Sequence, residues 1–77
     1  MSKKYTLYSS EGCHLCELAL EICTPLVSQE QLNIVDIVDD EQLVALYGVH
    51  IPVLERMSDN EKLFWPFTAE QVKHLFA

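Results

Sequence analysis

Two cysteines three residues apart, Cys13 and Cys16, constrain the fold of this chain more than any other feature of its sequence. They follow a strand-like segment (4–9) with aromatic and β-branched residues and a short turn that ends at Gly12. Apolar residues then recur at helical spacing, so the cysteines stand where a strand gives way to a helix. One helical turn holds two such Cα atoms within the roughly 4.4–6.8 Å that a disulfide requires. The spacing therefore predicts a dithiol that opens and closes with little backbone movement.

The two cysteines are not equivalent in this arrangement. Cys13 stands at the start of the expected helix, where unpaired backbone N–H groups and the positive end of the helix dipole favour a thiolate. Cys16 lies one turn inside and nearer the core. Glu11 and Glu17 disfavour a further negative charge, and His14 offsets them when it is protonated. The helix start thus favours the thiolate of the first cysteine and not of the second.

The rest of the chain gives alternating strand and helix signals. We expect strands at 4–9, 32–38, 52–57 and 61–65, and a first helix from Cys13 to about Thr24 or Ser28. The first two strands flank a helix and should pair in parallel, whereas the last two should form an antiparallel hairpin. The order β-α-β-α-β-β-α predicts a single α/β domain over residues 1–77 with a four-stranded mixed sheet.

Finer features of the later elements can also be predicted. The apolar run 32–38 suits a strand buried on both faces. Asp39 is expected to cap the second helix and Gly48 to follow it as the C′ residue. The apolar side of that helix would be Leu43, Val44, Leu46 and Tyr47. Thr68 and Gln71 should form a capping box at the start of the last helix.

Charge and hydrophobicity narrow the possible partners and location. The net charge is −7, and no Lys or Arg occurs between Tyr5 and Glu55, so a nucleic-acid partner is not expected. No apolar run reaches the roughly 18 residues that a membrane span needs. Lys3 and Lys4 are not followed by the apolar region of a secretory signal, so we expect a cytoplasmic protein. We also expect it to be a monomer without membrane contact. In that compartment, three cysteines argue against a structural disulfide framework and for redox work.

The third cysteine, Cys23, is the main candidate for a further metal ligand. Zinc needs four ligands, and Cys23 lies seven residues beyond Cys16, about 10 Å farther along a helix. We therefore expect Cys23 to be a core residue and the chain to hold no metal site.

A proline opens the third expected strand, in the run His50-Ile51-Pro52-Val53. Beside a dithiol, we expect the Ile51–Pro52 bond to be cis. This geometry would leave the Ile51 backbone exposed for pairing with an extended peptide or a thiol substrate. The candidate substrate-binding residues are thus Ile51, Pro52 and His14.

Together these segments resemble the glutaredoxin-like branch of the thioredoxin superfamily over essentially the whole chain. The matching segments are Gly12-Cys13-His14-Leu15-Cys16, Asp39-Asp40-Glu41-Gln42-Leu43, Tyr47-Gly48-Val49, Ile51-Pro52-Val53-Leu54 and Leu63-Phe64-Trp65-Pro66-Phe67. The resemblance implies a minimal thioredoxin fold and a thiol–disulfide oxidoreductase, with Cys13 as nucleophile, Cys16 as resolving thiol and Pro52 as cis-proline. The implied partners are a protein or small-molecule disulfide and an external thiol reductant, with no bound cofactor.

The chain also departs from the glutaredoxin pattern. His14 and Leu15 replace the usual Pro-Tyr pair between the cysteines, and no Gly-Gly pair follows the fourth strand. Basic residues that would receive the glutathione carboxylates are missing near the dithiol. The sequence therefore predicts that glutathione is a poor partner. Two other functions stay open, namely a non-catalytic binding module and an iron–sulfur or metal carrier that uses Cys13 as a ligand.

Overall fold

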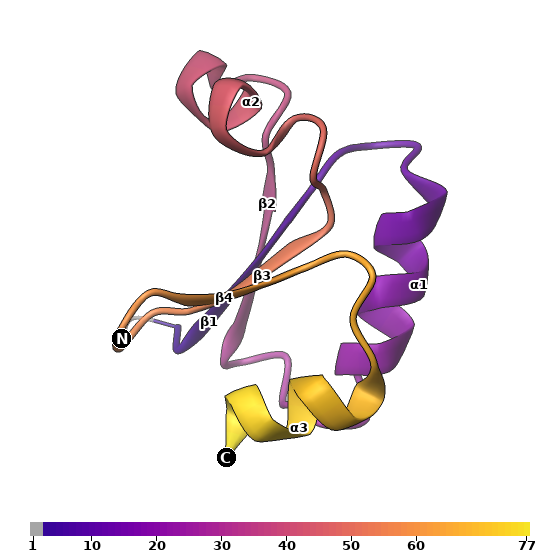
Figure 1. The fold of residues 1–77 in the computed structure, drawn as a ribbon, viewed down its shortest axis with the longest axis vertical. Helices are drawn as coiled ribbons and strands as arrows, with labels where there is room; N and C mark the ends of the chain where they lie inside the picture. The colour runs from indigo at the N-terminus through magenta and orange to yellow at the C-terminus, as the bar shows by residue number, and fades with distance from the viewer. Residues whose placement is uncertain (1–2) are drawn as a thin grey trace.

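Four strands form one mixed sheet in the computed structural model, which describes residues 3–77 (Figure 1). The strands are β1 (Tyr5–Ser9), β2 (Leu32–Asp36), β3 (Val53–Arg56) and β4 (Glu61–Phe64). Their order in the sheet is β2-β1-β3-β4, with β1 parallel to β2 and antiparallel to β3, and with β3 and β4 antiparallel. The predicted element order and strand pairing are confirmed.

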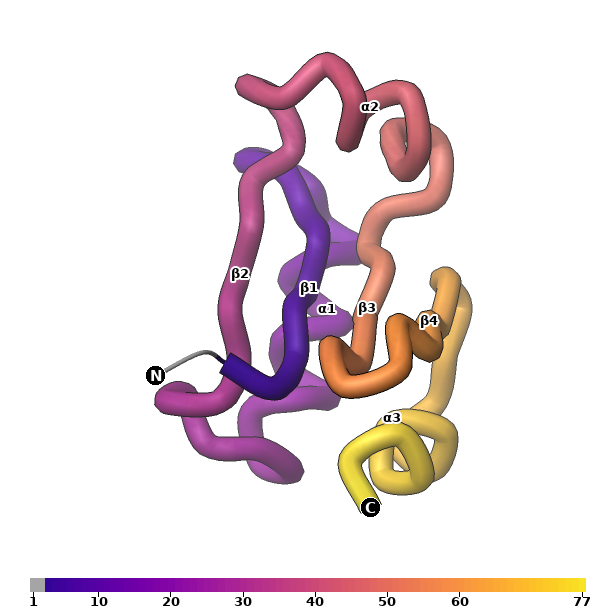
Figure 2. The backbone as a smooth tube through the Cα atoms, turned by 90° about the vertical axis from the view of Figure 1, so that its left-hand side faces the viewer, coloured from indigo at the N-terminus to yellow at the C-terminus, as the bar shows by residue number. Residues whose placement is uncertain are grey.

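The chain also forms three helices: α1 (His14–Cys23), α2 (Glu41–Tyr47) and α3 (Ala69–Phe76). The main core is formed by α1 and α3 against one face of the sheet, with Leu7 and Leu54 of the strands packed on Cys23 and Val72 of the helices. Figure 2 shows α2 beyond the end of the sheet where β1 and β2 finish. A smaller cluster around Tyr47 holds it there. No helix in residues 3–77 is long and apolar enough to cross a bilayer.

Local sequence signals explain where α1 and α3 begin. Gly12 has φ +78°, a left-handed conformation that glycine adopts without steric cost, and Cys13 follows as the N-cap of α1. At α3, the Thr68 hydroxyl accepts from the Gln71 N–H (3.2 Å) and the Gln71 side chain accepts from the Thr68 N–H (2.7 Å). The predicted capping box is therefore confirmed.

The expectation for the second strand is wrong in two respects, its end and its burial. β2 ends at Asp36, and it is an edge strand rather than one buried on both faces. Ile34 is 51% exposed. An apolar run marks a strand but does not reveal its place in the sheet, which depends on pairings with distant residues.

The expectations for α2 also need correction. Asp40, not Asp39, is the N-cap, and its carboxylate accepts from the N–H groups of Gln42 and Leu43, the second and third residues of the helix. Gly48 has φ −53°, so it is not a left-handed C′ residue. Its lack of a side chain matters because a Cβ there would clash with the Val44 carbonyl oxygen. Of the four apolar residues, Leu43 and Tyr47 pack inward, whereas Val44 and Leu46 are exposed.

Candidate functional site

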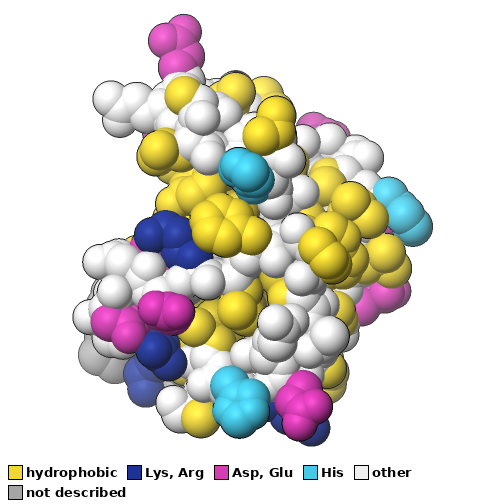
Figure 3. Space-filling model, viewed as in Figure 1, with side chains coloured by type: hydrophobic (Ala, Val, Ile, Leu, Met, Phe, Trp, Pro, Cys, Tyr) yellow, Lys and Arg dark blue, Asp and Glu magenta, His cyan; other side chains and the backbone are white. Residues whose placement is uncertain are grey.

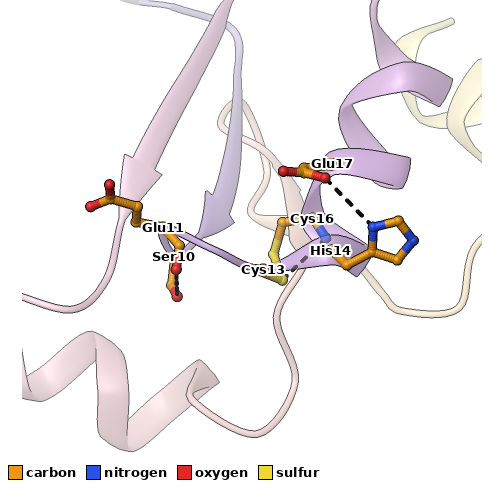
Figure 4. The surroundings of a disulfide bond; sticks show 6 residues. All are labelled: Ser10, Glu11, Cys13, His14, Cys16 and Glu17. Atoms are coloured by element: carbon orange, nitrogen blue, oxygen red, sulfur yellow. Dashed lines mark hydrogen bonds and ion pairs between the residues drawn. A yellow bond between two sulfur atoms is a disulfide. The ribbon is translucent and has the colours of Figure 1, made fainter.

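The cysteine pair lies where the chain leaves β1 and enters α1 (Figure 4). The Cys13 N–H donates to the Ser10 carbonyl (3.2 Å), which fixes the turn before the helix. As N-cap, Cys13 offers its Sγ to the N–H of Cys16 at 3.1 Å. A backbone donor therefore points at the Cys13 sulfur, which is the contact that stabilises a thiolate when the bond opens.

The two cysteines are joined by a disulfide, with their Cα atoms 5.2 Å apart. The predicted pairing is thus present in the fold. Cys13 is partly exposed, whereas Cys16 is only 5% exposed. An attacking or leaving sulfur in solvent therefore reaches Cys13 more readily than Cys16.

The loop before β3 was the second predicted part of the site. Its Ile51–Pro52 bond is cis, as expected, and Pro52 is buried while Ile51 is half-buried. The N–H of Ile51 donates to the Tyr47 carbonyl (3.0 Å), so that group is already used within the protein. Pairing with a peptide would therefore have to use the Ile51 carbonyl. A second cis bond, Trp65–Pro66, follows β4 and was not foreseen from the sequence.

Carboxylates flank the disulfide on both sides. Glu11 lies in the loop before Cys13, and Glu17 lies on the first turn of α1 (Figure 4). His14 Nδ1 lies 3.5 Å from a Glu17 oxygen, and both side chains are more than 70% exposed, at 79% and 73%. His14 thus contacts an acidic neighbour rather than the cysteine sulfurs.

A hollow of about 220 Å³ adjoins both cysteines between the start of α1 and the ends of β1 and β2. Its walls include both flanking glutamates and the half-exposed Ile34. Sequence reasoning missed Ile34 as a neighbour of the dithiol. The parallel pairing of β1 with β2 carries the signal, because it sets Ile34 beside Leu7, a core residue of β1 that also lines this hollow.

The third cysteine lies apart from this site. Cys23 is fully buried in the main core, and burial raises the pKa of its thiol to about 11. Within residues 3–77, no three His, Cys, Asp or Glu side chains gather in a way that could hold a metal ion. Cys23 is therefore a core residue, as the sequence predicted.

A buried acidic group on the other face of the sheet was not predicted. Glu55 of β3 is 4% exposed and accepts hydrogen bonds from the Tyr8 hydroxyl (2.6 Å) and the Asn60 amide (2.9 Å), with Lys62 Nζ at 3.4 Å. Burial alone would raise the pKa of Glu55, but these donors lower it below its ordinary value. The pKa of Tyr8 is raised by its own burial and by Glu55. Glu55 is thus a charged acceptor, and the Tyr8 hydroxyl is a neutral donor to it.

Comparisons with known proteins agree with this geometry. The family model described as "Glutaredoxin-like domain (DUF836)" matches residues 4–77. No curated protein matches the chain. The X-ray structure of structural-genomics target XcR50 from X. campestris is 33% identical with TM-score 0.81, covering 94% of this chain and 93% of that one. The solution structure of Ne2328 from Nitrosomonas europaea is 26% identical with TM-score 0.76, covering 96% and 91%. Fold, cysteine pair and family match together show that this chain belongs to the glutaredoxin-like domain family (DUF836).

Proposed function

We propose that this protein is a dithiol–disulfide oxidoreductase of glutaredoxin type. The observation that carries the proposal is the unequal setting of two bonded cysteines, with Cys13 partly exposed at a helix N-cap and Cys16 buried one turn later. Such asymmetry gives one sulfur access to substrate and reserves the other for an internal reaction.

The reaction balances in two exchange steps. In the reduced protein, the Cys13 thiolate attacks one sulfur of a substrate disulfide, and the other substrate sulfur leaves as a thiolate that takes up a proton. Cys16 then loses its proton and attacks Cys13 Sγ, which releases the second substrate thiol. The substrate gains two electrons and the protein becomes the Cys13–Cys16 disulfide. An external thiol reductant must supply two electrons to restore the dithiol.

The loop before β3 and His14 are the proposed substrate contacts. The Ile51 carbonyl would pair with the backbone of an extended substrate, and the buried Pro52 would hold that segment in place. His14 is exposed beside the cysteines, where its imidazole, when protonated, would bring a positive charge near an incoming group. We place this chemistry in a cytoplasmic monomer.

Glutathione should be a poor reductant or substrate for this site. The carboxylates of glutathione would approach the like charges of Glu11 and Glu17. No Lys or Arg occurs between Tyr5 and Glu55 to receive them. Compared with a site that holds both glutathione carboxylates by charge-assisted hydrogen bonds, the loss of these two contacts, at roughly 1.5–3 kcal/mol each, weakens binding about 10²-fold or more. A glutathione-coupled assay beside an ordinary dithiol glutaredoxin should show slow turnover. A comparable rate would show that another feature receives the carboxylates.

Redox titration followed by a turnover assay tests the proposal. The protein is equilibrated in dithiothreitol buffers and alkylated, and Cys13 and Cys16 should be protected together in a single two-electron transition. The protein should then accelerate reduction of a protein disulfide by dithiothreitol. A reducible pair without acceleration would favour a binding module. A visible absorbance band in anaerobically purified protein would favour an iron–sulfur carrier.

A further inference from the structure

We propose that the hollow beside the cysteines selects disulfides that carry a Lys or Arg next to the reacting sulfur. This inference rests on the proposed function, because it names the substrate class of the same dithiol. It concerns the hollow between α1, β1 and β2, whose walls include Cys13 and Cys16. The loop before β3 is a separate part of the proposed substrate contact.

The walls of the hollow suit a long cationic side chain. Leu7, Leu20 and Ile34 give it an apolar floor, and Glu11 and Glu17 stand at its edge as exposed carboxylates. The aliphatic stem of Lys or Arg packs on apolar surface while its charged end reaches water or a carboxylate. A side chain beside the reacting substrate sulfur would therefore lie on the floor and end at a glutamate.

These two carboxylates are not neutralised by Lys or Arg. Among residues 3–77, Glu17 has only His14 as an ionic neighbour, at 3.5 Å, and no ion pair or hydrogen bond engages the Glu11 carboxylate. His14 carries charge only when protonated. Glu11 is thus free to meet a cation on the substrate, and Glu17 can do so when His14 is neutral.

The charge of the whole molecule points the same way. No Lys or Arg occurs from Tyr5 to Glu55, so β1, α1, β2 and α2 carry none. Lys4 and Arg56 flank the far end of β1, since Tyr5 pairs with Arg56, whereas the end next to the site pairs Ser9 with Asp36. On the face in Figure 3, Lys and Arg side chains lie over the hairpin and near α3, and none lies over α2 or the start of α1. Lys3 lines a neighbouring hollow together with Leu20 and Ile34, but its Nζ donates to the Gln29 carbonyl (3.1 Å), which lies before the start of β2. A cationic substrate therefore meets carboxylates at the cysteine end of the hollow, while the nearest lysine is hydrogen-bonded toward the other end of β2.

Three peptide disulfides of one sequence test the inference, differing only in Lys, Gln or Glu beside the reacting cysteine. The second-order rate constant for oxidation of the reduced protein should fall in the order Lys, Gln, Glu, by about three- to fivefold per step at low salt. The steps should shrink as salt rises. Each rate is compared with that of the Gln peptide, so that changes in Cys13 reactivity cancel.

Paired substitutions show whether the hollow causes this order. The double variant Glu11→Gln and Glu17→Gln should bring the three peptides within about twofold of one another. Glu30→Gln removes the same charge at the opposite end of β2 and should keep the order. Equal rates for all three peptides with the unmodified protein, or an order that survives the double variant, would overturn the inference. Failure of every peptide to react, the neutral one included, would instead overturn the proposed function and the inference with it.

Discussion

At one end of the sheet, Arg56 links the β3–β4 hairpin to α3, whereas at the other end a partly exposed Cys13 is flanked by exposed side chains. The Arg56 guanidinium donates to both oxygens of Asp59 (2.9 and 2.7 Å) and to the Leu75 carbonyl (3.0 Å). The hydrogen bond from Arg56 is the main cause that lowers the pKa of Asp59 to about 2. At the site, the carboxylates of Glu11 and Glu17 lie free or beside a histidine. The acid next to the hairpin is thus paired with an arginine, whereas the acids beside the cysteines have no Lys or Arg partner among residues 3–77.

The two shorter helices show the same contrast in their packing. α3 is held by a capping box and buries Val72 and Leu75 in the main core. α2, next to the site, buries Tyr47 and leaves Val44 and Leu46 exposed at 44% and 62%. Most of the stability should therefore lie in the α1–α3 layer, and the site end should tolerate change.

The largest effect should come from removing the proposed nucleophile. Cys13→Ser leaves no thiolate to attack the substrate, so disulfide turnover should fall to background, on the order of 10³-fold or more. Cys23→Ala is the matched control because it removes a thiol from the same helix away from the site, and it should keep turnover. Turnover that survives in Cys13→Ser would show that Cys13 is not the nucleophile.

Two leucine substitutions sharpen the contrast between the helices. Leu75→Ala opens a cavity under α3, where the side chain is 5% exposed, and should lower the free energy of unfolding by about 2–5 kcal/mol. Leu46→Ala on α2 should change it by less than about 0.5 kcal/mol. Urea unfolding of the unmodified protein and of the two variants measures both changes in the free energy of unfolding. Similar losses in the two variants would mean that α2 is packed as tightly as α3.

Alkylation of the reduced protein compares the exposed and buried thiols of α1. At pH 7 the raised pKa of Cys23 leaves it with at least about 10²-fold less thiolate than an ordinary cysteine, and its burial hinders the reagent further. Mass mapping after a short pulse should find label on Cys13 alone. Labelling of Cys23 should increase as pH rises toward 11. Label that appears first on Cys23 would show that α1 faces the other way.

A smaller loss of stability than that of Leu75→Ala should come from replacing the buried acid of β3. The pKa of Glu55 is lowered in the folded state, so its charge stabilises the fold above the pKa of the unfolded chain, and this contribution disappears as pH falls through the folded value. Glu55→Gln should cost about 1 kcal/mol at pH 7 and lose less stability than the unmodified protein between pH 5 and pH 3. Denaturant titrations at these pH values test it. If the free energy of unfolding of Glu55→Gln fell with pH as steeply as that of the unmodified protein, Glu55 would not contribute to the loss of stability in acid.

Much of this fold is predictable because its signals are local. Thr68 and Gln71 are three residues apart, and Gly12 and the two cysteines mark the change from strand to helix within one segment. The edge position of β2 and the exposure of Ile34 are different, because they depend on β3 pairing with the other side of β1 and not with β2. Sequence alone does not reveal that choice.

The site divides in the same way. Cys13, Cys16 and the cis bond before Pro52 lie in short motifs and were predicted. The hollow and the Glu55 cluster were not, since each brings together residues from segments far apart in the chain. Glu55 and Tyr8 are 47 positions apart. An acid directly after two buried apolar residues of β3 was the signal, but its partners lie on β1 and in the hairpin.

Trapping a mixed disulfide tests the central claim, the division of roles between the two cysteines. Reduced Cys16→Ser protein is mixed with a peptide disulfide, and the products are mapped by mass. We expect a stable adduct on Cys13, because the thiol that would resolve it is missing, and no adduct in the reciprocal Cys13→Ser protein. An adduct on Cys16 in the Cys13→Ser protein, formed as fast as the one on Cys13, would contradict the account.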